Sequence, residues 1–246
     1  MFFEKLKKLI GRQYYPLNRV EVSGQQLLAN YKRLSSLDKK IKVAPVLKSN
    51  AYGHGIVEVG KTLESVKAPF FCVDSLYEAY KLYKTKVKTK ILIMGYVNPE
   101  NLKIKELPFS YAVFDIYQMK QILKYQLQAK IHIFVDTGMH REGLPIAELE
   151  QFIKSIPKEY KKNIEGVMSH FGASEKPEII ETKNQIELFK KALKIISKYG
   201  LNPRWRHIAN SSGLLNHDRL ELAGFSNLAR SGIALYDSVC RLITHI

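Results

Sequence analysis

The stretch VAPVLKSNAYGHG, residues 43–55, runs from an apolar segment directly into a lysine and then into a glycine-rich turn. Its apolar part extends back to residue 41 and has the length and β-branched content of a buried strand. Lys48 follows that strand at once, so we expect its side chain at the end of the strand and not in bulk water. This stretch therefore joins the first predicted strand to a candidate reactive group.

Seven further apolar runs follow, and amphipathic segments with helical spacing separate them. The eight runs cover residues 41–47, 70–73, 91–94, 111–114, 131–135, 164–168, 207–209 and, more weakly, 227–229. Ser75 with Glu78 forms a capping-box pattern at one helix start, and Asp115 is a predicted N-cap at another. Strands that alternate with helices indicate a parallel sheet with right-handed crossovers, and near-continuous apolar strands indicate that both sheet faces are covered.

Polar residues follow several of these runs at the point where each run ends. They are Lys48, Asp136, Ser169, His170, Asn210, Ser211 and Arg230. An open doubly wound sheet fits the same alternation but would scatter several of these side chains, whereas the strand ends of a (β/α)8 barrel converge on one mouth. We therefore predict an α/β fold, a single-domain TIM-like (β/α)8 barrel.

Composition is that of a globular chain, with 46% hydrophobic and 25% charged residues among 246. Two isolated cysteines, Cys72 and Cys240, form neither a disulfide framework nor a zinc motif, so we expect no metal and a cytoplasmic location. The net charge of +16 leaves a nucleic-acid-binding protein as one alternative, but the lysines are spread over helical faces and turns. We expect no nucleic-acid partner and no membrane span.

The residues after Lys48 suggest what this amine does. A lysine at a strand end can lose its proton and condense with a carbonyl group. Tyr52 can donate a hydrogen bond to a phosphate, and Gly53 and Gly55 let the backbone approach a ligand closely. The sequence has no GxSxG, P-loop, GxGxxG or HExxH motif. The pattern therefore favours a phosphate-bearing carbonyl cofactor, a description that pyridoxal phosphate fits.

At this point residues 18–236 resemble the N-terminal barrel domain of alanine racemase, a pyridoxal phosphate enzyme of fold-type III. The lysine segment matches the family's cofactor signature almost residue for residue. Four more motifs follow in the family's order: VDTGMHREG (135–143), SHFGASE (169–175), HIANSSG (207–213) and ARSGIALY (229–236). The resemblance implies interconversion of L- and D-alanine for peptidoglycan precursors.

The resemblance also assigns roles by position. Lys48 would hold the cofactor covalently and exchange a proton on one face of the substrate Cα. Four residues would hold the cofactor phosphate, the last two through backbone N–H groups: Tyr52, Ser211, Gly232 and Ile233.

The remaining roles concern the cofactor ring and the substrate. Arg230 would face the pyridine nitrogen, with His170 supporting it by a hydrogen bond. Arg141 would orient the phenolic oxygen of the cofactor and the substrate carboxylate. Because a guanidinium does not readily give up its proton, the ring nitrogen would stay unprotonated, which favours simple reprotonation of Cα over transamination. Where many relatives carry a carbamylated lysine that positions this arginine, the sequence has Phe134.

The ends of the chain depart from the family pattern. Residues 1–17 are a predicted extension with a possible short helix, and residues 237–246 form a divergent tail where relatives continue into a β-rich C-terminal domain. In the family's homodimer, that domain supplies the tyrosine that acts as second base, so we expect a truncated product with weak or no activity alone. Two alternatives stay open: a non-catalytic pyridoxal phosphate-binding barrel, and a racemase of another amino acid such as serine or lysine.

Overall fold

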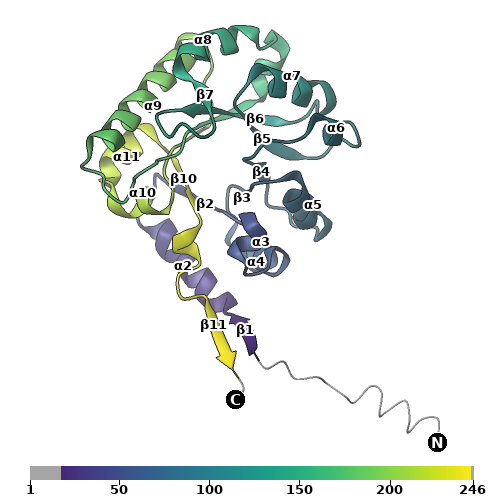
Figure 1. Ribbon diagram of the computed structural model, residues 1–246, viewed down its shortest axis with the longest axis vertical. Coiled ribbons are helices and arrows are strands. Elements are labelled where there is room, and N and C mark those ends of the chain that lie inside the picture. Colours follow the sequence, from purple (N-terminus) through teal and green to yellow (C-terminus); the bar gives the residue numbers. More distant parts are fainter. Residues whose placement is uncertain (1–17, 245–246) are drawn as a thin grey trace, which may run out of the picture.

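The computed structural model describes residues 18–244 (Figure 1). The predicted extension, residues 1–17, lies outside the described residues. Within the described part, eight parallel strands form the wall of a (β/α)8 barrel, with helices arranged around them. The strands are β2 Lys42–Pro45, β3 Phe71–Val73, β4 Ile91–Ile93, β5 Phe109–Val113, β6 Lys130–Asp136, β8 Ile164–Met168, β9 Trp205–His207 and β10 Leu228–Ser231.

Two joints close the barrel. The order β3-β4-β5-β6-β8-β9 forms one continuous parallel sheet, to which the short β7 Leu144–Pro145 adds beside β6, while β10 pairs separately with β2. A single bridge between Val46 and Cys72 connects the β2 end to β3. On the other side, the backbone N–H of Arg230 donates to the Ala209 carbonyl at 2.9 Å, which connects β10 to the chain just past β9. The strand ends therefore surround one common mouth.

All eight predicted strands are present, and the seventh is displaced. The apolar run at residues 207–209 begins at the last residue of β9 and continues into the segment after it, because the strand itself covers Trp205–His207. Ile208 and Ala209, just after the strand, are fully buried. Burial produced the apolar run, but ladder pairing with β8 ends at His207, so hydrophobicity alone placed the strand two residues late.

Helices cover the outside of the strands. They are α2 Gly24–Ser36, α3 Lys48–Tyr52, α4 Ile56–Leu63, α5 Leu76–Lys84, α6 Pro99–Leu102, α7 Ile116–Tyr125, α8 Ile146–Ser155, α9 Ile180–Lys198, α10 Ser211–Asn216 and α11 Arg219–Phe225, with 3₁₀ turns η1 Glu64–Val66, η2 Lys158–Asn163 and η3 Ile233–Leu235. Asp115 caps α7 as predicted, accepting from the Gln118 N–H at 2.6 Å. In the part of the chain that the structure describes, no helix is both long and apolar enough to cross a membrane.

The start of α5 follows only half of the predicted capping box. Ser75 Oγ accepts from the Glu78 N–H at 3.3 Å, as expected for an N-cap. The Glu78 carboxylate, however, does not return to Ser75: it accepts from the N–H groups of Asp74 at 3.0 Å and Asn50 at 3.2 Å. The expectation of a reciprocal capping box was therefore wrong, because the turn after β2 offers the carboxylate another donor.

Apolar packing fills both sides of the barrel wall. A large buried cluster lies between the strands and the helices. A smaller cluster joins alternate residues of β2, β3, β4, β9 and β10 with Phe70, and it includes Trp205, the only tryptophan of the chain. Because successive side chains of a strand point to opposite faces, these residues fill the barrel interior. The interior core supports the mouth above it.

The two ends of the described chain pair outside the barrel. β1 Asn18–Val22 and β11 Cys240–Thr244 form a two-stranded antiparallel sheet that projects from the body of the molecule (Figure 1). The predicted divergent tail, residues 237–246, thus contains a strand in its described part.

Candidate active site

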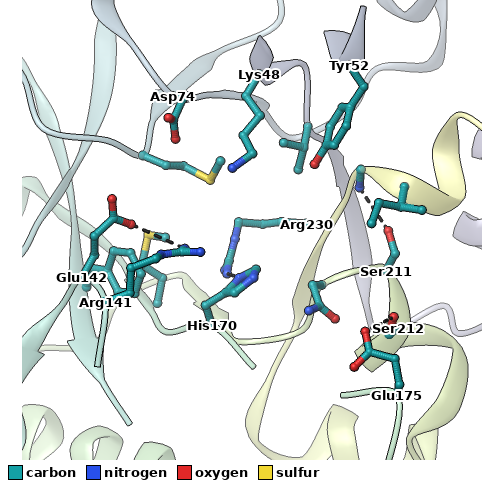
Figure 2. A pocket seen from close by; sticks show the side chains of 17 residues that line it. Lys48, Tyr52, Asp74, Arg141, Glu142, His170, Glu175, Ser211, Ser212 and Arg230 are labelled. Atoms are coloured by element: carbon teal, nitrogen blue, oxygen red, sulfur yellow. Dashed lines mark hydrogen bonds and ion pairs between the residues drawn. The ribbon is translucent and has the colours of Figure 1, made fainter. Parts of the chain in front are cut away.

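A cavity opens at the carboxyl ends of the barrel strands, and it is lined by all eight residues to which the resemblance assigned a role (Figure 2). These residues are Lys48, Tyr52, Arg141, His170, Ser211, Arg230, Gly232 and Ile233. They come from the end of β10 and from the segments that follow β2, β6, β8, β9 and β10, up to 185 positions apart, and barrel closure brings them together. Of the other polar residues predicted at the mouth, Asn210 lines the cavity, whereas Asp136 and Ser169 do not. The cavity is also lined by acidic residues that the sequence did not single out, namely Asp74, Glu142 and Glu175.

Lys48 begins a turn of left-handed backbone. Residues 49–52 have φ angles of 53°, 55°, 56° and 53°, although none of them is glycine. A left-handed conformation costs about 1–2 kcal/mol per residue for L-amino acids, so the surrounding structure must hold this turn in place. Gly53 and Gly55, with φ of 86° and 91°, continue the positive-φ path at positions where no Cβ opposes it. Apart from these two glycines, nothing in the sequence signalled the turn.

Polar contacts hold the left-handed turn. The Glu78 carboxylate accepts from the Asn50 N–H, and Asn50 Oδ1 accepts from the Ile56 N–H at 3.1 Å. The Ala51 N–H donates to the Leu47 carbonyl at 2.8 Å. As a result, the side chains of Lys48 and Tyr52 both point into the cavity (Figure 2).

A cradle of hydrogen-bonding groups forms one end of the cavity. Ser211 Oγ accepts from the N–H groups of Gly232 at 3.1 Å and Ala234 at 3.2 Å. The phenolic oxygen of Tyr52 lies against Gly232, where a Cβ would overlap it. Burial and the nearby Asp74 raise the pKa of Tyr52, so the phenol keeps its proton at neutral pH. Hydroxyl and backbone N–H groups together suit an oxyanion. Ala234 in this cradle was missed by the sequence analysis.

Arg230 occupies the floor of the cavity. Its Nη1 donates to His207 Nδ1 at 2.8 Å and to the His207 carbonyl at 3.1 Å, and its Nη2 donates to the Ser169 carbonyl and to His170 Nδ1 at 3.0 Å. A guanidinium has five N–H groups, so these four bonds leave the one on Nε for a ligand. Burial lowers the pKa of Arg230 to about 10, and the group remains a cation at neutral pH.

His170 lies beside Arg230, and the hydrogen bond expected between them is present. Burial, followed by the charges of Arg230, Arg141 and Lys48, lowers the pKa of His170 to about 3. The imidazole is therefore neutral, and its Nδ1 accepts a hydrogen bond from the Arg230 guanidinium.

His207, the second imidazole on Arg230, was not among the predicted site residues. It is fully buried, and its Nε2 lies 2.8 Å from Nδ1 of another fully buried histidine, His132. In the sequence, His207 stood out only as the first residue of the HIANSSG motif, without a role of its own. Inward-facing positions on β9 and β6 were the signal that would have found both residues, because polar side chains inside a barrel need partners.

Arg141 lies on the opposite side of the cavity from the cradle (Figure 2). Its Nη2 is 3.5 Å from Glu142 Oε2, and both side chains are partly exposed. Phe134, at the position where a lysine was expected to support this arginine in relatives, instead lines the cavity and packs edge-on against Phe114. In this chain Arg141 therefore forms an ion pair with the carboxylate of the next residue, Glu142.

The cavity thus presents three chemically different regions: an amine at Lys48, an oxyanion cradle at Tyr52 and Ser211, and a buried cation at Arg230 (Figure 2). This donor set matches a ligand that carries an aldehyde, a phosphate and an aromatic nitrogen.

Comparisons with known proteins give a consistent result. Residues 22–238 match the family described as "Alanine racemase, N-terminal domain". The chain is 34% identical over 223 residues to alanine racemase from Carboxydothermus hydrogenoformans, covering 88% of this chain and 59% of that protein. It is 31% identical over 239 residues to the amino-acid racemase of Enterococcus faecalis, covering 94% of this chain and 33% of that protein.

Solved structures resemble the barrel over nearly the whole chain. Alanine racemase from Bacillus anthracis with bound L-Ala-P has 27% identity and a TM-score of 0.80, with 92% of this chain and 59% of that chain covered. Alanine racemase from Clostridium difficile has 25% identity and a TM-score of 0.81, with 91% and 59% covered. The chain therefore spans at most about three fifths of the length of these relatives.

Proposed function

The chain belongs to the alanine racemase family through its N-terminal domain, and on this premise we propose that it is the cofactor-binding barrel of a racemase that interconverts L- and D-alanine. The observation that carries the proposal is the convergence of Lys48, Tyr52 and Arg230 on one cavity. D-alanine from this reaction would serve peptidoglycan synthesis, and the working protein would be a cytosolic homodimer.

We propose pyridoxal phosphate as the cofactor, because the three regions of the cavity fit its three functional groups. Lys48 would hold the aldehyde carbon. Tyr52, Ser211 and the backbone N–H groups of Gly232 and Ile233 would hold the phosphate, and Gly232 supports this because a side chain there would overlap Tyr52. The Arg230 Nε–H would face the ring nitrogen. When bound, the cofactor would supply the electron sink that stabilises negative charge at the substrate Cα.

Lys48 would move the proton at Cα. Its ε-amino group, when not attached to the cofactor, would remove or return a proton on one side of the substrate Cα. Arg230 would donate a hydrogen bond without giving up its proton, because burial lowers its pKa only to about 10. Its other N–H groups donate to neighbouring protein atoms. Arg141 would bind the substrate carboxylate, with Glu142 limiting its movement.

Racemisation requires proton transfer on both faces of Cα, and Lys48 reaches one of them. In the family that this chain resembles, a tyrosine of the C-terminal domain transfers the proton on the other face. A polypeptide of these 246 residues should therefore bind the cofactor but racemise alanine poorly.

Cofactor attachment can be tested directly. Purified chain incubated with pyridoxal phosphate should develop an absorbance band near ~420 nm, typical of a lysine-bound pyridoxal group. Borohydride reduction followed by peptide mapping should label Lys48. Lys48→Ala should lose the band, whereas the control Lys61→Ala, an exposed lysine on α4, should keep it. A band of unchanged intensity in Lys48→Ala would refute the proposed attachment.

Proton transfer can be tested apart from racemisation. In deuterium oxide, the loaded chain should exchange the Cα hydrogen of one alanine enantiomer faster than it inverts that centre, because exchange with retention needs a single base. NMR of the recovered alanine measures exchange, and chiral chromatography measures inversion. Inversion as fast as exchange would contradict the one-base assignment.

The substrate has one specific alternative. The similarity to an enzyme named amino-acid racemase supports a racemase of another amino acid. The same exchange assay with serine and lysine in place of alanine distinguishes the two. A chain that forms the ~420 nm band but exchanges no amino acid would instead be a non-catalytic cofactor-binding barrel.

A further inference from the structure

A row of polar side chains leads away from Arg230 through the barrel interior and ends at an exposed lysine. Arg230 Nη1 donates to His207 Nδ1, and His207 Nε2 lies 2.8 Å from His132 Nδ1. His132 Nε2 lies 3.8 Å from Glu165 Oε2, and Glu165 Oε1 pairs with Lys90 Nζ at 3.0 Å. Glu165 is near the start of β8, and Lys90 immediately precedes β4, so the row runs from the cavity to the opposite end of the barrel.

The donor at one end of the row fixes every proton in it. A guanidinium can only donate, so His207 Nδ1 must accept and its proton must be on Nε2. That N–H donates to His132 Nδ1, which places the His132 proton on Nε2. This second N–H faces a carboxylate, which can only accept when ionised. The row is therefore polarised in one direction, from cation to anion.

The row has these proton positions only if both imidazoles are neutral and Glu165 is charged. Burial lowers the pKa of His132 and lowers that of His207 well below its ordinary value. Burial alone would raise the pKa of Glu165, but the Lys90 ammonium 3.0 Å away and the nearby imidazole of His132 outweigh it and lower the pKa to about 2. With both imidazoles neutral, each contact between the Arg230 cation and the Glu165 anion has one donor and one acceptor, which is the favourable arrangement in a buried row.

Packing prevents the rings from turning. His132 stands edge-on to Phe70, with ring centroids 5.2 Å apart and planes at 87°. It also stands edge-on to His207, at 78°. Gly166 leaves space for the ring, because a Cβ there would lie 2.6 Å from His132 Cε1. The imidazole nitrogens therefore keep their positions along the row.

We infer that Glu165 and His132 are positioning residues that hold the Arg230 guanidinium in the cavity, by way of His207, in a single orientation. Their role in ligand binding rests on the proposed function, whereas the proton positions do not. Without the carboxylate, His132 has less reason to keep its proton on Nε2. The alternative tautomer would place two N–H groups face to face and weaken the hold on Arg230.

Histidine NMR tests the proton positions in the chain without added cofactor. The chain has seven histidines, so selective ¹⁵N labelling gives a spectrum that single His→Gln variants can assign. We expect His132 and His207 to be neutral Nε2–H tautomers between pH 6 and 8. In Glu165→Gln, a second tautomer should appear at His132. A proton on Nδ1 of either residue in the unmodified chain would overturn the inference.

Cofactor binding gives the second readout. Glu165→Gln should raise the dissociation constant for pyridoxal phosphate roughly tenfold, as loss of outer partners does at metal sites. Glu148→Gln is the matched control, since it makes the same change at an exposed carboxylate on α8, outside the row, and should leave both readouts unchanged. If Glu165→Gln does not fold, His132→Phe takes its place, because it keeps an aromatic ring at this position. It should raise the dissociation constant for pyridoxal phosphate by a similar factor.

The two hypotheses fail in different ways. If no cofactor band forms in any variant, the proposed function is wrong, and the tautomers still decide the inference. If the band forms but Glu165→Gln changes neither the tautomers nor the dissociation constant, the inference alone is wrong.

Discussion

Gly232 leaves room for Tyr52, since a Cβ at position 232 would lie 2.8 Å from Tyr52 Cζ and closer still to its phenolic oxygen. The left-handed turn that carries Tyr52 and the strand end that carries Gly232 thus meet in the cradle of the cavity. The fit connects two sequence motifs that lie 180 positions apart.

Gly232→Ala should weaken cofactor binding, because the new methyl group displaces the Tyr52 hydroxyl from the cradle. We expect a dissociation constant about tenfold higher, equivalent to about 1.4 kcal/mol. Absorbance titration with pyridoxal phosphate measures it. Gly224→Ala is the control, since a Cβ there meets no atom within 4 Å. Equal affinities for the two variants would show that the contact has no role in binding.

Glu78→Gln should destabilise the turn after Lys48. The carboxylate accepts from two backbone N–H groups, and charged acceptors contribute about 1.5–3 kcal/mol per bond. An amide retains one acceptor oxygen, so we expect a loss of about 1–2 kcal/mol in the free energy of unfolding by denaturant. Glu148→Gln, an exposed carboxylate on α8, should change it by less than about 0.5 kcal/mol. A similarly small change in Glu78→Gln would mean that packing alone holds the turn.

Stability should fall in acid because of His170. Its pKa is about 3 in the folded chain and near 6.5 when unfolded, so only the unfolded chain takes up this proton between those values. The stabilisation is complete above about pH 6.5 and is lost as the pH falls toward 3. Between pH 6 and 4, His170→Gln should lose about 1.4 kcal/mol less per pH unit than the unmodified chain. Parallel pH profiles in chemical denaturation would contradict the buried neutral state.

Glu142→Gln should affect the substrate more than the fold. The ion pair with Arg141 is partly exposed, and such pairs contribute at most about 1 kcal/mol. We expect nearly unchanged thermal stability and cofactor affinity, with the KM for alanine in Cα exchange raised about threefold as Arg141 becomes mobile. A change in cofactor affinity without a change in KM would mean that Arg141 acts on the phenolic oxygen of the cofactor and not on the substrate carboxylate.

The site residues at strand ends could be predicted from the sequence because each directly follows an apolar run. Lys48 and Arg230 follow apolar runs, and in a parallel barrel that position already places a side chain at the mouth. The hydrogen-bond partners of such residues could not be predicted in this way. The Glu78 carboxylate could accept from the Ser75 N–H, as in a capping box, or from other backbone N–H groups nearby. It accepts from Asn50 and Asp74, and only the fold brings Asn50 within reach.

By itself, the sequence determined the strand–helix alternation, the barrel and the set of residues around its mouth, since burial and turn chemistry leave periodic and local signals. Only the tertiary structure decided the left-handed turn at residues 49–52, the pairing of Arg141 with Glu142, and the row from Arg230 to Glu165. His132 and His207 are 75 positions apart and meet only because the barrel closes. Proton positions follow from such meetings, because the donors and acceptors that a buried group can use depend on which distant side chains face it.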